Sequence, residues 1–338
     1  MEINATTISV VIPTCNRKES LLRTIDSLYK QTYAIHEIII IDASDVSIKL
    51  EELINENHCM NVSVLYTKPS VCLQRNMGIK KAKGEYIFLL DDDNIIDANY
   101  IETIINFNKQ NPEAIAVSGI VMERKSVDEW QYAFPEVSFL GLLWIYIFQL
   151  GIWADLKEMK GTIFTSIPLY FLKSYYNKKG NTLSKAGWPV LTNFNKPYFR
   201  TQIYGLGVSI IKKTWLENNL YEEKLERNGM GDNYGVAINL TEEQGVFVLS
   251  DVRAYHYKEI SNRLSSVEAY YQRVVALHFF IIIKNNLSSS RKWLFWSLVG
   301  NFIFSVIKFN FKFGVANLKL MKIILLNKNP LLNTQSRK

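Results

Sequence analysis

The sequence predicts an α/β fold built on a mostly parallel sheet with flanking helices, followed by an amphipathic and apolar helical region at the C-terminal end. Three observations predict it. Apolar runs of strand length alternate with segments of helical period over about the first 120 residues. The apolar runs end in polar clusters, which is where an open parallel sheet binds its ligands. After Glu268 the chain has no acidic residue and mixes Lys and Arg with apolar stretches.

Five apolar runs are expected to form strands, because each is short and rich in β-branched or aromatic residues. They cover residues 8–14, 37–42, 62–66, 86–90 and 114–122. Apolar residues at helical spacing lie between and after these runs, over 16–29, 49–54, 73–82 and 99–107. Asn16 and Glu19 are expected to form a capping box on the first helix.

Composition limits the class of protein. A chain of 338 residues is long enough for one large domain with an appendage or for two domains. Three cysteines at irregular spacing favour neither a zinc site nor a disulfide framework, so a reduced, cytosolic environment is expected. No basic segment precedes the first apolar run, so no secretory signal is expected. Of the 39 Lys and Arg, 11 follow Glu268. The chain up to Glu268 contains the remaining 28 together with all 32 Asp and Glu. Because the basicity is confined to the tail, no nucleic-acid partner is expected.

The stretch YIFLLDDDN (86–94) drives an apolar strand into three aspartates. Adjacent carboxylates repel one another, so the cluster needs water, a cation or basic partners. Asp91 and Asp93 can hold a divalent cation together with substrate phosphates, which is the way proteins usually bind Mg²⁺. The alternative is a solvated turn with Asp at a helix N-terminus.

Polar residues after other strands suit a nucleotide. Backbone amides after the first strand can hold a nucleotide, with Arg17 near its phosphate. Asp42 ends the second strand, where it can accept hydrogen bonds from a base or a ribose. Arg75 lies in a following helix and can pair with a pyrophosphate. Each alone is also explained by ordinary helix capping.

The ordered motifs VVIPTCNR, IIIIDASD, QRNMGI and FLLDDDN resemble the family 2 glycosyltransferases of the GT-A fold, a Rossmann-like sheet with flanking helices. The resemblance implies a nucleotide-sugar donor, Mn²⁺ or Mg²⁺ at a DxD motif, and inversion of the anomeric centre. It implies metal ligation by Asp91 and Asp93. The residues it implies in donor binding are Pro13, Thr14, Arg17, Asp42, Arg75, Asp91 and Asp92.

The same resemblance implies a catalytic base in the second half of the chain. MGDN stands where the family has a GED turn, which puts Asp232 in the place of the glutamate. We expect Asp232 to be the base because the amide of Asn233 cannot accept a proton from an acceptor hydroxyl. A helix N-cap is the structural alternative for Asp232. The fallback carboxylates are Glu222, Glu223 and Glu226.

His256 follows the last predicted strand, where GT-A enzymes often have a histidine near the metal. It is expected to be a third metal ligand or a diphosphate contact, with a structural histidine as the alternative. Arg263 is expected to help neutralise the leaving phosphate. The family's processive members have a QxxRW motif that this chain lacks, so transfer of a single sugar is expected.

Two apolar regions raise the question of a membrane. Val137–Ala154 has no charged residue, but a single crossing there would separate the aspartate triplet from Asp232. It is therefore expected to pack in the core, to form an oligomer contact or to lie in a membrane interface. The basic tail is expected to lie in the plane of an anionic membrane surface at the cytoplasmic face, and a helical pair completing the core is the alternative.

The expected organisation is a nucleotide-sugar-binding half (1–123), an acceptor-binding and catalytic half (124–268) and a membrane-associating region (269–338). The expected function is metal-dependent, inverting, non-processive transfer of one sugar to a lipid-linked or cell-surface glycan acceptor. One alternative is an inactive sugar-nucleotide-binding scaffold, suggested by the atypical MGDN. The other is a sugar-1-phosphate nucleotidyltransferase, which the absence of a GxGTR-like loop disfavours.

Overall fold

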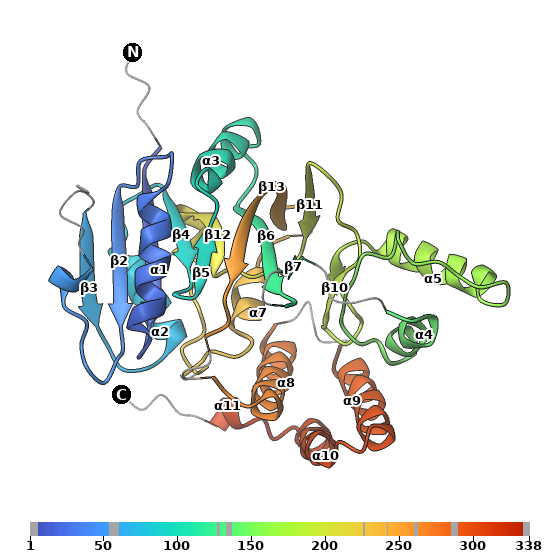
Figure 1. Cartoon of the computed structure of the whole chain (residues 1–338). Coiled ribbons are helices and arrows are strands. Elements are labelled where there is room, and N and C mark those ends of the chain that lie inside the picture. Colours follow the sequence, from blue (N-terminus) through green and yellow to red (C-terminus); the bar gives the residue numbers. More distant parts are fainter. Residues whose placement is uncertain are drawn as a thin grey trace. The chain divides into compact units, whose positions relative to one another are not determined.

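The computed structural model describes residues 6–53, 61–126, 129–132, 137–225, 227–241, 243–259, 263–284 and 290–333 (Figure 1). The chain divides into two compact units. The first unit comprises Met1–Tyr132, Asn195–Arg200 and Tyr204–Arg263. The second comprises Ala133–Phe194, Thr201–Ile203 and Leu264–Lys338.

The first unit is a large sheet with helices on its faces. Its strands are β1 (Ile8–Thr14), β2 (Glu37–Asp42), β3 (Val62–Tyr66), β4 (Tyr86–Leu90), β5 (Asn94–Ile96), β6 (Ala116–Arg124), β7 (Trp130–Gln131), β11 (Tyr198–Thr201), β12 (Val208–Lys212) and β13 (Val246–His256). Its helices are α1 (Lys18–Tyr29), the 3₁₀ helix η1 (Leu50–Glu52), α2 (Val71–Lys81), α3 (Tyr100–Gln110), α6 (Lys213–Leu216) and α7 (Asp232–Ala237).

The strand order places the ends of β1 and β4 side by side. The order is β11-β13-β6-β12-β4-β1-β2-β3, with β5 beside β13 and β7 beside β6. β3, β2, β1 and β4 are parallel, while β12 runs antiparallel to both β4 and β6. The chain leaves β1 toward β2 and later returns on the other side of β1 as β4, so the order of the strands reverses there. Such a switch point opens a crevice at the carboxyl ends of the strands.

Both faces of this sheet are buried, which explains the continuous apolar runs. Ile8, Val10 and Ile12 of β1 belong to one core cluster with residues of α1 and α3. The next residue along, Val11, faces α2, where a Cβ on Gly78 would lie 2.2 Å from its Cγ1. A side chain larger than hydrogen at Gly78 would therefore push α2 off the sheet.

The second unit is mainly helical. Its elements are α4 (Phe139–Phe148), β8 (Ile152–Trp153), α5 (Ser166–Lys179), β9 (Thr182–Leu183), β10 (Pro189–Leu191), α8 (Ser266–Ile283), α9 (Ser290–Ile307), α10 (Phe311–Leu326) and α11 (Pro330–Asn333). Its three strands form a small sheet in the order β8-β10-β9. A core cluster joins α4 and α5 to that sheet, and α8, α9 and α10 pack on one another.

The apolar region Val137–Ala154 is not one continuous helix. It forms α4, a turn at Gln149 and the short strand β8, with Leu142 and Phe148 buried and Leu140 exposed. Within the described parts of the chain, no helix combines the length and the hydropathy needed to span a membrane.

Two local expectations are wrong. The capping box on α1 does not form: Arg17 is the N-cap residue, and the Asn16 side chain hydrogen-bonds Asp45 instead, donating to its carboxylate and accepting from its backbone amide. Asn16 has φ 55°, a conformation that asparagine tolerates better than most residues. Of the helix expected over 49–54, the described residues form only the 3₁₀ turn η1, and Ile54 lies outside the described residues.

Candidate functional site

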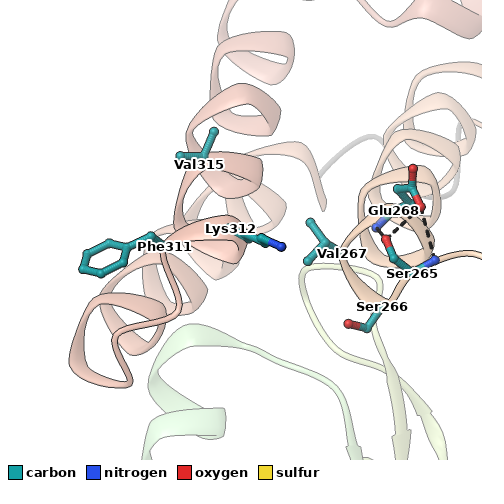
Figure 2. A pocket seen from close by; sticks show the side chains of 7 residues that line it. All are labelled: Ser265, Ser266, Val267, Glu268, Phe311, Lys312 and Val315. Carbon is teal, nitrogen blue, oxygen red and sulfur yellow. Dashed lines mark hydrogen bonds between the residues drawn. The ribbon is translucent and has the colours of Figure 1, made fainter.

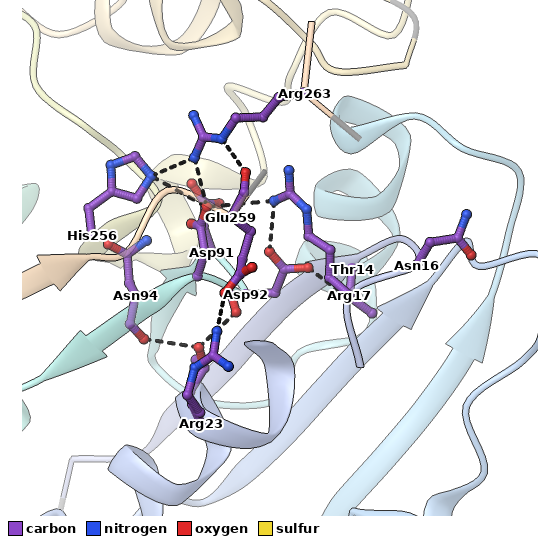
Figure 3. A network of polar contacts seen from close by, with 12 residues as sticks. Thr14, Asn16, Arg17, Arg23, Asp91, Asp92, Asn94, His256, Glu259 and Arg263 are labelled. Carbon is purple, nitrogen blue, oxygen red and sulfur yellow. Dashed lines mark hydrogen bonds and ion pairs between the residues drawn. The ribbon is translucent and has the colours of Figure 1, made fainter. Parts of the chain in front are cut away.

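The switch point brings the end of β1 to the aspartate triplet that follows β4. Val11 pairs with Leu89, so the parallel register carries Thr14 to the level of Asp92. The Thr14 hydroxyl donates a 2.7 Å hydrogen bond to Asp92 Oδ2. Thr14 and Asp92, which are separated by 78 residues in the sequence, therefore form one edge of a polar cluster (Figure 3).

Basic side chains surround two of the three aspartates. Arg17 Nη1 lies 3.2 Å from Asp92 Oδ1 and 3.6 Å from Asp93 Oδ2. Arg263 Nη2 lies 3.1 Å from Asp93 Oδ2. Burial raises the pKa of Asp92 to about 7, although Arg17 and Thr14 act in the opposite direction. Burial also works to raise the pKa of Asp93, but His256, Arg17 and Arg263 outweigh it and lower that pKa.

His256 lies between two carboxylates because of its register in the sheet. At the end of β13 it pairs with Asn94 on one side and with Glu123 on the other. Its Nδ1 lies 3.0 Å from Glu123 Oε1, and its Nε2 lies 3.4 Å from Asp93 Oδ2. Burial alone would lower the pKa of His256, but the contacts with Asp93 and Glu123 raise it to about 9. The two carboxylates therefore favour the protonated form of the imidazole in this arrangement.

Arg75 joins the aspartate triplet to the second half of the unit. Its Nη2 lies 2.6 Å from Asp91 Oδ1, its Nη1 pairs with Asp232 Oδ2, and its guanidinium lies 5.0 Å from the centre of the Tyr221 ring. Arg75 is 5% exposed. Its expected contact with a pyrophosphate stays a prediction. In the structure both terminal nitrogens pair with carboxylates instead.

Asp232 is the first residue of α7, and Gly231 in the left-handed conformation is the N-cap. The expected N-cap alternative for Asp232 is therefore off by one residue. Burial raises the pKa of the Asp232 carboxyl, and Arg75 opposes that shift without cancelling it. The next residue, Asn233, has a buried side-chain oxygen without a hydrogen-bond partner in the described structure.

The other expected site residues lie at the edges of this cluster or away from it. Pro13 is buried in β1. Asp42 accepts hydrogen bonds from the backbone amides of Ser44 (2.9 Å) and Ile48 (2.8 Å), so it orders the loop after β2. Glu223 accepts a hydrogen bond from Asn76. The carboxylate of Glu222 accepts a hydrogen bond from the backbone amide of Lys224, and Glu226 lies outside the described residues.

The residue types expected to hold a metal fit a divalent cation, because carboxylates and imidazole suit Mn²⁺ and carboxylates suit Mg²⁺. Their arrangement differs from a formed site. Asp91 is directed to Arg75, and Asp93 contacts Arg17, Arg263 and His256. Among the residues described, no group of three His, Cys, Asp or Glu side chains converges on a point where an ion would sit.

Sequence reasoning missed Glu123 and Lys258. Glu123 lies near the end of β6, and its carboxylate contacts His256 and pairs with Lys258. The sequence contains one signal for Glu123: β6 ends in the charged pair of MER. Three consecutive aspartates form a clear pattern in a sequence, whereas a single glutamate at a strand end does not.

Acidic and basic side chains alternate across the described site. Five carboxylates (Asp91, Asp92, Asp93, Glu123, Asp232) face five basic groups (Arg17, Arg75, His256, Lys258, Arg263) within the part of the chain that the structure describes. A polar cluster of this kind at a sheet switch point is suited to a charged ligand. The sequence profile of one family, described as Glycosyl transferase family 2, matches residues 9–183. The chain belongs to glycosyltransferase family 2.

Two relatives of this family 2 glycosyltransferase match parts of the chain at more than 30% identity. Glycosyltransferase GlyG of Streptococcus pneumoniae serotype 4 is 36% identical over 100 residues, which cover 29% of this chain and 33% of GlyG. Poly(ribitol-phosphate) beta-N-acetylglucosaminyltransferase TarP of Staphylococcus aureus is 31% identical over 123 residues, which cover 35% of this chain and 38% of TarP. The match thus spans only about a third of these two relatives.

A solved structure extends the likeness to the fold of nearly the whole chain. S. aureus TarS 1-349 in complex with UDP-GlcNAc matches with a TM-score of 0.53 at 16% identity, covering 95% of this chain and 80% of TarS 1-349. The expected GT-A fold is confirmed, because the mixed sheet with flanking helices matches that of a glycosyltransferase.

Proposed function

We propose that this protein transfers a single sugar from a nucleotide-sugar donor to a lipid-linked or cell-surface glycan acceptor, with inversion of the anomeric centre. One observation carries the proposal. Arg75 pairs with both Asp91 and Asp232, although these carboxylates are far apart in the sequence. The aspartate triplet and the expected base therefore adjoin one place at the switch point, as transfer between two bound substrates requires.

The donor's diphosphate matches the basic side chains at the triplet. Arg17 and Arg263 pair with Asp92 and Asp93, and both offer several N–H donors of the kind that bind phosphate oxygens. Binding the donor would exchange carboxylate contacts for phosphate contacts at these two arginines. The UDP-GlcNAc bound to S. aureus TarS supports a nucleotide sugar as the ligand of this fold.

The balance of charge supports a metal ion. The described cluster already pairs its five acidic groups with five basic groups, so a diphosphate would leave an excess of negative charge. Asp91 and Asp93, with His256 in its neutral form, would hold Mn²⁺ or Mg²⁺. When bound, that ion stabilises the negative charge of the departing diphosphate.

Asp232 would accept the proton of the acceptor hydroxyl. Its pKa is raised by burial, which brings a carboxylate closer to the basicity that a general base needs near neutral pH. Attack by the deprotonated oxygen on the face opposite the diphosphate inverts the anomeric centre. Arg75 keeps the Asp232 carboxylate oriented until the substrates are in place.

We further propose that transfer occurs at the cytoplasmic face of the cell membrane. α9 and α10 expose apolar side chains next to Lys308, Lys312 and Lys319, and such surfaces adhere to anionic headgroups. The exposed apolar residues are Ile303, Phe304, Ile307, Phe309, Phe311, Val315 and Leu318. An oligomer that covers the same surface is the other use of these residues, and light scattering of the free protein would detect it.

Donor hydrolysis tests the catalytic proposal. The protein is incubated with UDP-, GDP- and dTDP-sugars in Mn²⁺, in Mg²⁺ and with a chelator, and nucleotide release is measured. One donor is expected to be turned over in metal and not in chelator. Asp232→Asn is expected to lower transfer to an acceptor by ~10²–10⁴-fold with donor binding retained. Asp26→Asn makes the same chemical change at an exposed aspartate and should have no effect.

Three results would count against the proposal. Donor binding without turnover, unaltered by Asp232→Asn, would indicate a scaffold. Release of pyrophosphate from a nucleoside triphosphate and a sugar 1-phosphate would indicate a nucleotidyltransferase. A product that retains the donor's anomeric configuration, measured by proton NMR, would exclude direct attack assisted by Asp232.

A further inference from the structure

A groove lies between the first turns of α8 and the outer face of α10, both in the second unit (Figure 2). It consists of two adjoining cavities of about 670 and 290 Å³ that share Val267, Glu268, Lys312 and Val315. Phe311 lines the larger cavity, and Lys319 lines the smaller one. Each of the two helices contributes both charged and apolar side chains to the lining.

The basic groups of the groove are available to a ligand. Lys312 and Lys319 are two turns apart on one face of α10, roughly 10 Å along the helix axis. Both are exposed, and no acidic side chain of the described residues pairs with either. The N-terminal end of α8 also lines the groove, and the positive end of its helix dipole favours an anion there.

The single carboxylate in the lining is already engaged. Glu268 Oε2 accepts hydrogen bonds from the Ser265 hydroxyl (2.7 Å) and the Ser265 backbone amide (3.2 Å), which closes the capping box of α8. No Asp or Glu follows it in the chain. One carboxylate against two lysines leaves the groove positive.

The apolar side chains of the groove select among anionic ligands. Phe311 is 69% exposed and Val315 51%, and both lie directly beside Lys312. A free phosphate or a hydrophilic polymer would satisfy the lysines and leave these side chains in water. An anionic lipid satisfies both, because its phosphate is joined to hydrocarbon.

We propose that this groove binds the phosphate headgroup of an anionic membrane lipid, with Lys312 and Lys319 on the phosphate oxygens and with Phe311 and Val315 in the acyl region. The inference rests on the proposed action at a membrane and makes it specific. The general proposal requires only a basic, apolar surface. The groove requires two particular lysines, Lys312 and Lys319. Removing these two should therefore weaken binding more than removing two lysines from elsewhere on or just after α10.

The test is sedimentation of the full chain with vesicles of phosphatidylcholine, with and without phosphatidylglycerol. The double variant Lys312→Gln, Lys319→Gln is compared with Lys322→Gln, Lys328→Gln, which removes the same charge from exposed lysines that do not line the groove. We expect the groove variant to lose about tenfold or more in affinity for the anionic vesicles, and the control about threefold or less.

Equal losses in the two double variants would overturn the groove and leave only general electrostatic attraction. Glycerol 3-phosphate that displaces the protein as well as the same amount of lipid would also overturn it, because the site would then recognise phosphate without hydrocarbon. Donor hydrolysis in solution separates the two proposals. If no donor is hydrolysed while the variants still differ on vesicles, the sugar-transfer proposal fails and the groove stands.

Discussion

Arg75 and Lys312 carry the same charge, yet the first unit buries its arginine between two carboxylates, while the second unit leaves its lysine in water beside exposed Phe311. The first unit has already paid the cost of desolvating its charges by pairing them. In the second unit, α10 exposes both lysines and apolar side chains on its surface. Paired charges inside a fold hold a site in position, whereas unpaired charges beside apolar surface indicate a partner outside the chain.

The largest expected effect tests the buried pairing. Arg75→Met removes the cation between Asp91 and Asp232 and leaves buried negative charge uncompensated. We expect the free energy of unfolding to fall by about 3–5 kcal/mol, measured by urea denaturation. The matched control is Arg23→Met, which breaks a more exposed pair with Glu259 and should cost about 1 kcal/mol or less.

Adding Asp91→Asn and Asp232→Asn to the Arg75→Met variant should restore much of the lost stability, because no unpaired charge then remains. If Arg75→Met is no more costly than Arg23→Met, the two carboxylates are not held together by Arg75. Arg75 would then no longer be an example of a buried, paired charge that holds the site of the first unit in position.

The next effect concerns the one described histidine that the second unit buries. His278 has no exposed surface, and its Nδ1 lies 3.3 Å from Asn329 Nδ2. Burial, helped by Arg291, lowers the pKa of His278 to about 4. Because the unfolded chain binds this proton more readily, the stability contributed by neutral His278 is present above about pH 6.5 and is lost as the pH falls toward 4.

The expected loss is roughly 3 kcal/mol across that interval, measured as the free energy of unfolding of the second unit. His278→Gln removes the titration and should flatten this part of the pH profile. A profile with the same slope in both proteins would show that His278 is not the group responsible.

The strands of the first unit were predictable because each is specified locally. β1, β2, β3 and β4 have the expected bounds. β1, β2 and β4 are apolar runs that are buried along nearly their whole length, and polar residues lie at or just after their ends, whereas β3 at the edge of the sheet is only partly buried. The fifth expected strand, 114–122, lies two residues further along, at Ala116–Arg124. The triplet, Thr14 and Arg17 were found by their position at strand ends.

The pairings inside the site were not predictable because they join residues far apart in the sequence. Arg75 lies 157 residues from Asp232, and β12 inserts between β4 and β6, a placement that no local pattern encodes. Asn16 shows the same limit on a smaller scale. Its local pattern fits a capping box, but a contact with Asp45 on a neighbouring loop outcompetes the cap.

A smaller effect separates the geometry of the site from the stability of the unit. A Cβ on Gly207 would lie 2.1 Å from Asp91 Oδ2, so Gly207→Ala must displace that carboxylate. Because the Asp91 side chain is 37% exposed, it can move without unfolding the sheet. We expect metal-dependent donor turnover to fall by roughly tenfold to a hundredfold, with little change in the unfolding temperature.

Gly205→Ala is the matched control for Gly207→Ala, because its Cβ would meet only Val121 Cγ2 at an ordinary 3.9 Å. It should leave turnover near that of the unmodified protein. Equal activity in the two variants would mean that the position of Asp91 does not matter for turnover.

The smallest expected effect on stability tests the exposed apolar surface of the second unit. Leu318 is 50% exposed on α10, whereas Leu320, two residues along, is 1% exposed. Because glutamine and leucine have similar helix propensities, Leu318→Gln should change the free energy of unfolding by about 0.5 kcal/mol or less, and Leu320→Gln by about 2–5 kcal/mol. The exposed substitution should nevertheless weaken binding to anionic vesicles, since it removes apolar area that the bilayer would cover. A Leu318→Gln variant that is clearly destabilised and still binds vesicles normally would show that this leucine packs inside the protein. The contrast between paired charges in the first unit and exposed apolar surface in the second would then fail at Leu318.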